Sequence, residues 1–259
     1  MNDISIDKSK YKHEQKHDNS NAYLSIVIPA HNEEARIESV LLNYCSHFPN
    51  QEIVVVCNGC IDTTPAIVDR LCLQYSQIKA LCFTEKLGKG GAIIEGFKAA
   101  EGGGIGFVDA DESVAPEDLE RMFNALSNAD GVIASRRLKE SRILHKQPWQ
   151  RRAGSKVFNL FVRIIFSMDF KDTQCGAKVF TREAIENVLD ILTTTGFEFD
   201  VELLWKLKNR GYKVIEFPIT WKHSEGSTFH LTNAPKMIFS LLKVRIWRTS
   251  GLQHDAPTW

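Results

Sequence analysis

The chain has 259 residues, 43% hydrophobic and 25% charged, a composition typical of one large globular α/β domain. Lys+Arg and Asp+Glu number 32 each, so no overall charge would draw the protein to nucleic acid, and any anion-binding site must be local. No apolar run approaches the roughly 20 residues needed to cross a bilayer, and residues 1–20 lack the apolar core of a signal peptide. We therefore expect a cytoplasmic protein with no nucleic-acid partner, no transmembrane segment and a disordered tail at 1–20.

The six cysteines lie mostly inside apolar segments and do not show the spacing of a disulfide framework. Cys57 and Cys60 have a spacing that occurs in zinc and redox sites, but no second pair or nearby histidine completes such a site. We expect reduced thiols, which fits a cytosolic protein.

Short β-rich runs alternate with helical patterns through the first half of the chain. Strands are predicted at 24–28, 52–56, 78–83, 105–108 and 131–134, and helices from about Glu33, after 62–65, at 92–100 and at 116–126. The second strand is nearly all apolar and β-branched, as a strand covered on both faces should be. This order predicts an α/β fold with a mainly parallel central sheet flanked by helices, whose ligands bind at the carboxyl ends of the strands.

The second half is less regular. A basic segment at 148–155 opens an apolar helix at 157–166, and a short strand is predicted at 177–180. Helices near 181–189 and 201–209, a strand at 213–218 and a last helix at about 234–248 complete the pattern. No repeat or linker divides the chain, so we predict one domain over 21–233, followed by an amphipathic helix and tail over 234–259.

Polar loops follow the first four predicted strands, at 29–33, 58–62, 86–91 and 109–111. On one edge of a parallel sheet they would form a single crevice. Asp109 and Asp111, one residue apart, can both face a divalent cation, which prefers oxygen ligands. The alternative is an acidic turn that caps the helix at Pro116.

Two further segments could bind anions. At 88–91, backbone N–H groups and Lys89 could hold a phosphate, although the segment is not a P-loop and could be a flexible helix start. Arg151, Ser155 and Asn159 recur every four residues and share one helix face, which suits either phosphate binding or a solvated polar stripe.

The ordered motifs resemble the family 2 glycosyltransferases of the GT-A fold, and among them the dolichyl-phosphate and polyprenyl-phosphate glucosyltransferases and mannose synthases. The motifs are IVIPAHNEE, VVVCNGCIDTT, EKLGKGGAI, FVDADE, ASR, R-x3-S-x3-N, DTQCGAKVF and FEFDVELL. DTQCGAKVF is the segment that indicates the lipid-phosphate branch. The resemblance implies inverting transfer of a hexose from a nucleotide-diphosphate sugar, with UDP-glucose as the expected donor, to a polyprenyl or dolichyl phosphate, with Mg²⁺ or Mn²⁺ as cofactor.

Carried over by position, the resemblance also implies site residues. Catalytic roles fall on Asp111, Arg136, Arg151 and Asp172. Donor contacts fall on Pro29, Ala30, Glu33, Asn58, Asp62, Lys89, Asp109, Ser155 and Gln174. The metal ligands would be Asp109 and Asp111.

The chain departs from the family pattern at several positions. His31 stands where the family usually has Tyr, Cys57-Asn58 replaces an acidic pair, and Ser113 stands where some members have a metal-binding Gln. After Gly226-Ser227 the usual Lys is Thr228. Members of this branch often carry C-terminal transmembrane helices, which are absent here.

Three rival interpretations stay open. A family 2 enzyme acting on a hydroxyl acceptor would need a base, for which Asp200 or Glu202 are candidates, although both could instead cap the helix they head. Nucleotidyl transfer is disfavoured because no Gly-rich loop follows the first strand. An inactive nucleotide-sugar-binding scaffold is the third.

The last helix predicts peripheral contact with the cytoplasmic membrane surface. Its apolar residues are Met237, Ile238, Leu241, Leu242, Ile246 and Trp247, and its cations are Lys236, Lys243, Arg245 and Arg248. Such a helix can lie on anionic lipid, or it can pack on its own domain.

Overall fold

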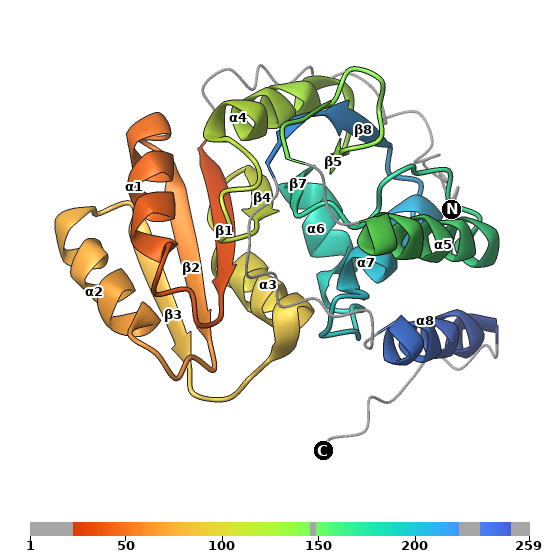
Figure 1. Cartoon of the computed structure of the whole chain (residues 1–259), viewed down its shortest axis with the longest axis horizontal. Coiled ribbons are helices and arrows are strands. Elements are labelled where there is room, and N and C mark those ends of the chain that lie inside the picture. The colour runs from red at the N-terminus through yellow and green to blue at the C-terminus, as the bar shows by residue number, and fades with distance from the viewer. Residues whose placement is uncertain (1–22, 146–148, 223–233, 250–259) are drawn as a thin grey trace, which may run out of the picture.

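A seven-stranded sheet forms the centre of the molecule (Figure 1). The computed structural model describes residues 23–145, 149–222 and 234–249, without the side chains of 149–153, 234–236 and 247–249, so the predicted tail at 1–20 and Thr228 lie outside it. The strands are β1 (Leu24–Ala30), β2 (Glu52–Asn58), β3 (Ile78–Phe83), β4 (Gly104–Val108), β5 (Gly131–Ser135), β7 (Ala177–Thr181) and β8 (Val214–Pro218). Their order is β3-β2-β1-β4-β7-β5-β8, and all pairs are parallel except those of β7 with β4 and β5.

Helices cover both faces of this sheet. They are α1 (Ile37–His47), α2 (Thr64–Gln74), α3 (Gly88–Ala99), α4 (Pro116–Asn124), α5 (Trp149–Phe166), α6 (Arg182–Leu189), α7 (Phe199–Asn209) and α8 (Ala234–Thr249). Because side chains alternate along a strand, Ile26 and Ile28 face one core with α1, α2 and α4. Val27 faces the other core, with α3 and α5 to α8. The predicted α/β class with a mainly parallel sheet is confirmed.

Several element boundaries differ from the prediction. β1 continues through Pro29 to Ala30. Its pairing with β4 already ends at Val27, so the missing N–H of the proline interrupts no hydrogen bonding between β1 and β4. α1 starts at Ile37, since residues 33–36 form a turn in which Arg36 N–H donates to Glu33 O (3.0 Å). α4 ends early, and a short 3₁₀ helix (Ala125–Asn128) follows it.

A second, two-stranded sheet was not predicted. It pairs β6 (Arg142–Ile143) with β9 (Thr220–Trp221) in parallel. Strands of two residues are too short to show an alternating pattern, so only tertiary pairing identifies them. All six cysteines are free thiols in this fold.

The order of strands places a ligand crevice at β1 and β4. β1 pairs with β2 on one side and β4 on the other, so the direction of chain winding reverses between β1 and β4. Such a switch point opens a crevice at the carboxyl ends of the strands. Glu33 follows β1 and Asp109 follows β4, which puts both at this edge.

α8 partly packs on its own domain. Met237 and Leu241 are buried, α8 contacts α5 and α7, and Arg245 Nε donates to Ile165 O (3.2 Å). Phe239 and Ile246 remain about three-fifths exposed, at 61% and 60%. Within the described residues, no helix has the length and apolarity of a membrane span.

Candidate active site

The acidic turn after β4 is the centre of the site. Asp109 N–H donates to Gly176 O (3.0 Å), and Ser113 N–H donates to Asp111 Oδ1 (3.0 Å). Glu112 adopts a left-handed backbone conformation with φ of 55°. Non-glycine residues take this conformation at a cost, and such strain is concentrated at functional turns. Here it lets the chain reverse directly behind the two aspartates.

Lys89 is the cation paired with this turn. Its Nζ lies 2.6 Å from Asp109 Oδ1, and α3 itself begins at Gly88, so the Gly-rich segment is a helix start that delivers a lysine to the crevice. Burial opposes the charge on Lys89, but Asp109 and Asp200 outweigh it and raise the lysine pKa. An ammonium group held charged in this position suits a phosphate ligand. Direct contact between Lys89 and the donor stays a prediction.

Negative charge accumulates around Asp111. Burial and then Asp109 raise the pKa of Asp111, against hydrogen bonds from Ser113. Burial also raises the pKa of Glu33, with the two aspartates adding to the effect and Arg36 opposing it through an ion pair. Crowded carboxylates of this kind are relieved by a divalent cation with hard oxygen preference. The two aspartates therefore offer the oxygen ligands that Mg²⁺ or Mn²⁺ prefers. Within the described residues no group of three or more His, Cys, Asp or Glu side chains could hold a metal, so a bound ion would need ligands from the donor as well.

Gly176 joins the 172–176 segment to the acidic turn. A Cβ at this position would lie 2.0 Å from Asp109 Oδ2, which no side chain tolerates. Only glycine lets the segment approach the carboxylate so closely. The two parts of the predicted site, near Asp109 and near Asp172, are thus in direct contact.

The half-buried Arg136 and the buried Asp172 form a two-pronged ion pair. Arg136 Nε and Nη2 donate to the two Asp172 oxygens at 2.7 and 2.8 Å, and its backbone N–H adds a third bond at 3.0 Å. Asp172 is 1% exposed, yet its pKa is lowered, because Arg136 outweighs the effect of burial. Glu216 accepts the backbone N–H of Asp172, and the Arg136 guanidinium lies over the Trp221 ring at 5.4 Å. The pair is thus rigidly held beside the crevice.

The remaining predicted residues on α5 and the 172–176 segment have mixed surroundings. Ser155 Oγ accepts a hydrogen bond from Arg137 Nη2 (2.8 Å). Gln174 Nε2 is buried without a hydrogen-bond partner within the described part of the chain, so it can still donate to a ligand. Arg151 belongs to α5, but its side chain lies outside the described residues.

Four predicted donor residues lie at the ends of β1 and β2 or directly after β2, and two of them, Asn58 and Asp62, hold loops in shape. Asp62 accepts N–H groups from Thr64 (3.0 Å) and Glu34 (3.1 Å). Asn58 accepts the N–H of Leu87 (2.6 Å) and donates to Gly88 O (3.1 Å). Pro29 is half-buried, while Ala30 is fully buried in the core. Donor binding by these four residues remains a prediction.

Asp200 and Glu202 are occupied by structural contacts. Lys178 Nζ, fully buried, donates to Asp200 Oδ1 (2.6 Å) and to Cys175 O (2.7 Å). Glu202 accepts hydrogen bonds from Thr193 and Thr194 and pairs with Lys206 at 2.5 Å. Neither carboxylate is placed as a free base, which disfavours a hydroxyl acceptor activated by them.

Sequence reasoning missed Gly176, Lys178 and Arg137 as site-shaping residues. Only Lys178 had a usable signal, since a lysine inside the apolar run of β7 requires a buried partner. Gly176 and Arg137 act through contacts with residues distant in sequence.

Comparison with known proteins decides the family. Residues 25–189 match the model of Glycosyl transferase family 2. The chain belongs to this family. It is 30% identical over 262 residues to the dolichyl-phosphate beta-glucosyltransferase of Saccharomyces cerevisiae, covering 92% of this chain and 78% of that one. It is 29% identical to the polyprenol monophosphomannose synthase of Mycolicibacterium smegmatis, covering 87% of each chain.

Other relatives are longer or more distant. Glycosyltransferase AglD of Haloferax volcanii is 31% identical to this chain in the matched region. The match covers 77% of this chain but only 33% of AglD. Glucosyl-3-phosphoglycerate synthase from Mycobacterium tuberculosis, solved with Mn²⁺, UDP and glucosyl-3-phosphoglycerate, superposes with a TM-score of 0.66 at 16% identity. That match covers 91% of this chain and 82% of the synthase, and it confirms the predicted GT-A fold.

Proposed function

We propose that this glycosyltransferase moves a hexose, with inversion, from a nucleotide-diphosphate sugar to a polyprenyl or dolichyl phosphate. The observation that carries the proposal is the contact of the acidic turn with the 172–176 segment through Gly176. This contact joins the carboxylates proposed to serve the donor to the segment of Asp172, the partner of the half-buried Arg136 that is proposed to bind a second phosphate. The lipid-phosphate acceptors named for the yeast and mycobacterial relatives support the same acceptor class, and UDP-glucose is the proposed donor.

The reaction needs little acid–base chemistry from the protein. A phosphate oxygen of the acceptor forms the new bond to the anomeric carbon, while the bond from that carbon to the diphosphate oxygen breaks. The acceptor oxygen is already anionic at neutral pH, so no general base is required, in agreement with the occupied state of Asp200 and Glu202. The residues contribute position and charge.

Asp109 and Asp111 are the proposed ligands of Mg²⁺ or Mn²⁺. When bound, the cation neutralises charge that develops on the departing diphosphate. Lys89 supplies a second positive charge at the same edge, 2.6 Å from Asp109. Arg136, Arg151 and Ser155 are proposed to orient the phosphates, and Asp172 holds Arg136 for that purpose.

The proposed site of action is the cytoplasmic membrane surface. α8 exposes Phe239 and Ile246, and Lys243 lies over the Phe239 ring at 4.6 Å. An exposed aromatic and aliphatic pair with adjacent cations suits a helix that lies in a lipid interface. Vesicle sedimentation of the full chain and of Phe239→Gln/Ile246→Gln tests this contact, and identical sedimentation of the two would refute it.

Sugar transfer to a short polyprenyl phosphate tests the reaction. A panel of nucleotide sugars is supplied with Mg²⁺ or Mn²⁺ to the wild type and to Asp111→Ala. We expect transfer by the wild type and a loss of at least about 100-fold in the variant. Donor binding or hydrolysis without transfer would favour a hydroxyl acceptor, and neither binding nor turnover would favour a nucleotide-sugar-binding scaffold.

A further inference from the structure

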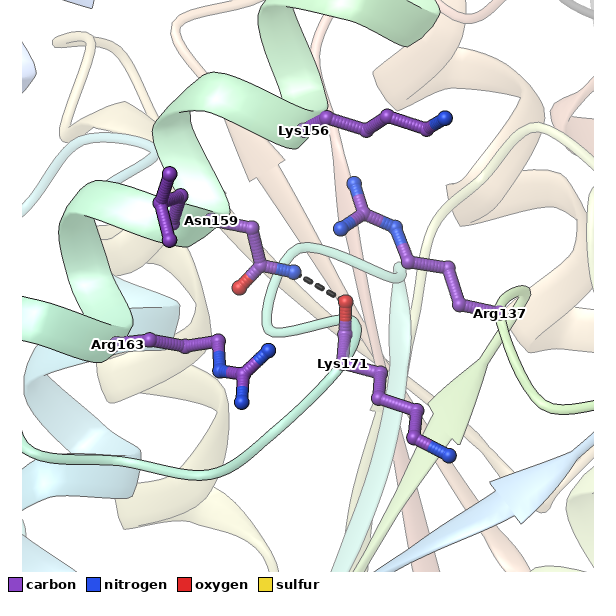
Figure 2. A pocket seen from close by; sticks show the side chains of 6 residues that line it. Arg137, Lys156, Asn159, Arg163 and Lys171 are labelled. Atoms are coloured by element: carbon purple, nitrogen blue, oxygen red, sulfur yellow. Dashed lines mark hydrogen bonds between the residues drawn. The ribbon is translucent and has the colours of Figure 1, made fainter.

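A positively charged pocket lies beside α5, apart from the acidic turn (Figure 2). Its volume is about 260 Å³, and it is lined by Arg137, Lys156, Asn159, Leu160, Arg163 and Lys171. Four of these six side chains are cationic and none is acidic. A concave site of this charge suits an anion with several oxygens, of which a phosphate ester is the commonest in biology.

The pocket is assembled from three separate elements. Lys156, Asn159 and Arg163 follow one face of α5, while Arg137 comes from the loop after β5 and Lys171 from the loop before β7. Figure 2 shows the guanidinium groups of Arg137 and Arg163 approaching from opposite sides of the hydrogen bond between Asn159 and the Lys171 carbonyl. Planar guanidinium groups on two sides can share one tetrahedral phosphate.

Asn159 gives the pocket an unmet hydrogen-bond acceptor. The residue is only 4% exposed, and its Nδ2 donates to Lys171 O. Its Oδ1 is buried and has no partner within the described residues. An orphaned amide oxygen beside cations calls for a ligand that carries a hydroxyl as well as an anion.

The cations keep donors free for a ligand. Arg163 pairs with Asp169 at 2.7 Å, but Asp169 is 92% exposed, so the pair is weak and exchangeable. Arg137 uses one guanidinium nitrogen on Ser155. The acids near Arg137 have other partners, because Asp172 is bonded to Arg136 and Glu216 to the backbone N–H groups of residues 171 and 172.

An exposed apolar stripe borders the pocket on the same helix. Val157, Leu160 and Ile164 are 69%, 57% and 68% exposed, and their spacing of three and four residues aligns them along α5. Large aliphatic side chains exposed in a row beside cations are typical of a helix that lies at a lipid interface. α8 lies beside α5 (Figure 1) and contacts it, and Phe239 of α8 is also exposed.

We propose that this pocket binds the phosphate and a headgroup hydroxyl of an anionic membrane phospholipid, while Val157, Leu160 and Ile164 enter the acyl boundary. The proposal extends the membrane contact proposed above and adds α5 to it. The phospholipid is a docking ligand and takes no part in the transfer.

The test measures binding, so it does not depend on sugar transfer. The probes are dihexanoyl-phosphatidylglycerol below its micelle concentration, inorganic phosphate, a short prenyl phosphate, and vesicles of phosphatidylcholine with 30% phosphatidylglycerol. The variant is Lys156→Gln/Arg163→Gln, and the matched control is Arg70→Gln/Lys98→Gln, which removes two surface cations that are likewise exposed, at 50% and 54%. Unchanged thermal unfolding verifies that both variants are folded.

We expect wild type to bind one phosphatidylglycerol per chain and to sediment with the vesicles. The variant should bind both the lipid and the vesicles at least about tenfold more weakly, since each basic residue near the surface contributes several-fold to binding. Binding by the control variant should stay within about twofold of wild type. An equal loss in the control would overturn the proposal in favour of diffuse attraction. The proposal would also be overturned if wild type bound inorganic phosphate as tightly as the lipid and did not bind the vesicles. Loss of prenyl phosphate binding alone in the variant would overturn it as well. Absence of sugar transfer refutes the proposed function and leaves these readouts unaffected.

Discussion

The buried ion pair between Lys178 and Asp200 should dominate the stability of the second half of the sheet. Lys178 is 0% exposed and Asp200 is 3% exposed. The perturbations are Lys178→Met, Asp200→Leu and the double variant. Each single change leaves one uncompensated charge in the core, between β7 and α7. The double change removes both charges and keeps apolar side chains of similar size.

The expected magnitude follows from what each variant leaves behind. Removing one partner of a buried pair costs about 3–5 kcal/mol. The cost of Asp200→Leu should lie toward the lower end of this range, because Lys178 retains its hydrogen bond to Cys175 O (2.7 Å). Replacing both residues should cost less than either single change, since apolar replacement of a buried pair is often near neutral. The coupling energy, which is the sum of the two single costs minus the cost of the double change, should therefore be at least about 3 kcal/mol.

Urea unfolding measures these differences. With an m-value near 3 kcal/mol/M, each single variant should unfold roughly 1 M below wild type, and the double variant much closer to it. Asp169→Ala is the control, because its exposed pair with Arg163 contributes at most about 1 kcal/mol. Single variants within roughly 0.3 M of wild type, or additive effects in the double variant, would refute the claim that the pair is buried and mutually dependent.

Three other predictions concern the crevice. Gly176→Ala should lower kcat about 100-fold at saturating metal, because its Cβ would displace Asp109; unchanged kcat would contradict the close approach. Arg136→Lys should cost about 1–3 kcal/mol in urea unfolding, because lysine cannot bind both oxygens of Asp172; wild-type stability would count against the pair. The pKa of Asp111 is raised by burial and Asp109, so Mn²⁺ affinity should decline with falling pH already above the ordinary aspartate range. Titration of Mn²⁺ binding from pH 7 to 4 measures this, and affinity that is flat to pH 4 would exclude it.

The strands and the polar edge could be predicted because their causes are local. The residues 53–56 are an unbroken apolar run that only a strand covered on both faces accommodates. The segment 62–65, with a proline at its end, signals a helix start, and α2 does begin at Thr64 with Pro65 in its first turn. The N-cap residue is Thr63, which makes no side-chain capping hydrogen bond. A parallel order of strands then assigns their carboxyl ends to one edge without further information.

The partners within that edge could not be predicted, because they are set by long-range packing. Arg136 and Asp172 are separated by 36 positions, and nothing local shows that one binds the other. A polar residue such as Asn58 can bind a ligand or hold a loop, and the neighbouring sequence does not distinguish the two roles. Its two hydrogen bonds to residues 87 and 88 become visible only once β2 and β3 are side by side.

The antiparallel insertion of β7 explains why the residues before a strand, rather than after it, complete the crevice. Parallel strands present their carboxyl ends to the ligand edge, as β4 does with Asp109 and β5 with Arg136. β7 runs the other way, and Ala177 pairs with Val108 at the end of β4. The residue preceding β7 must then meet the residue following β4, which is the contact of Gly176 with Asp109. A single reversed strand thereby brings the 172–176 segment, with the partner of Arg136, to the edge where the donor carboxylates lie.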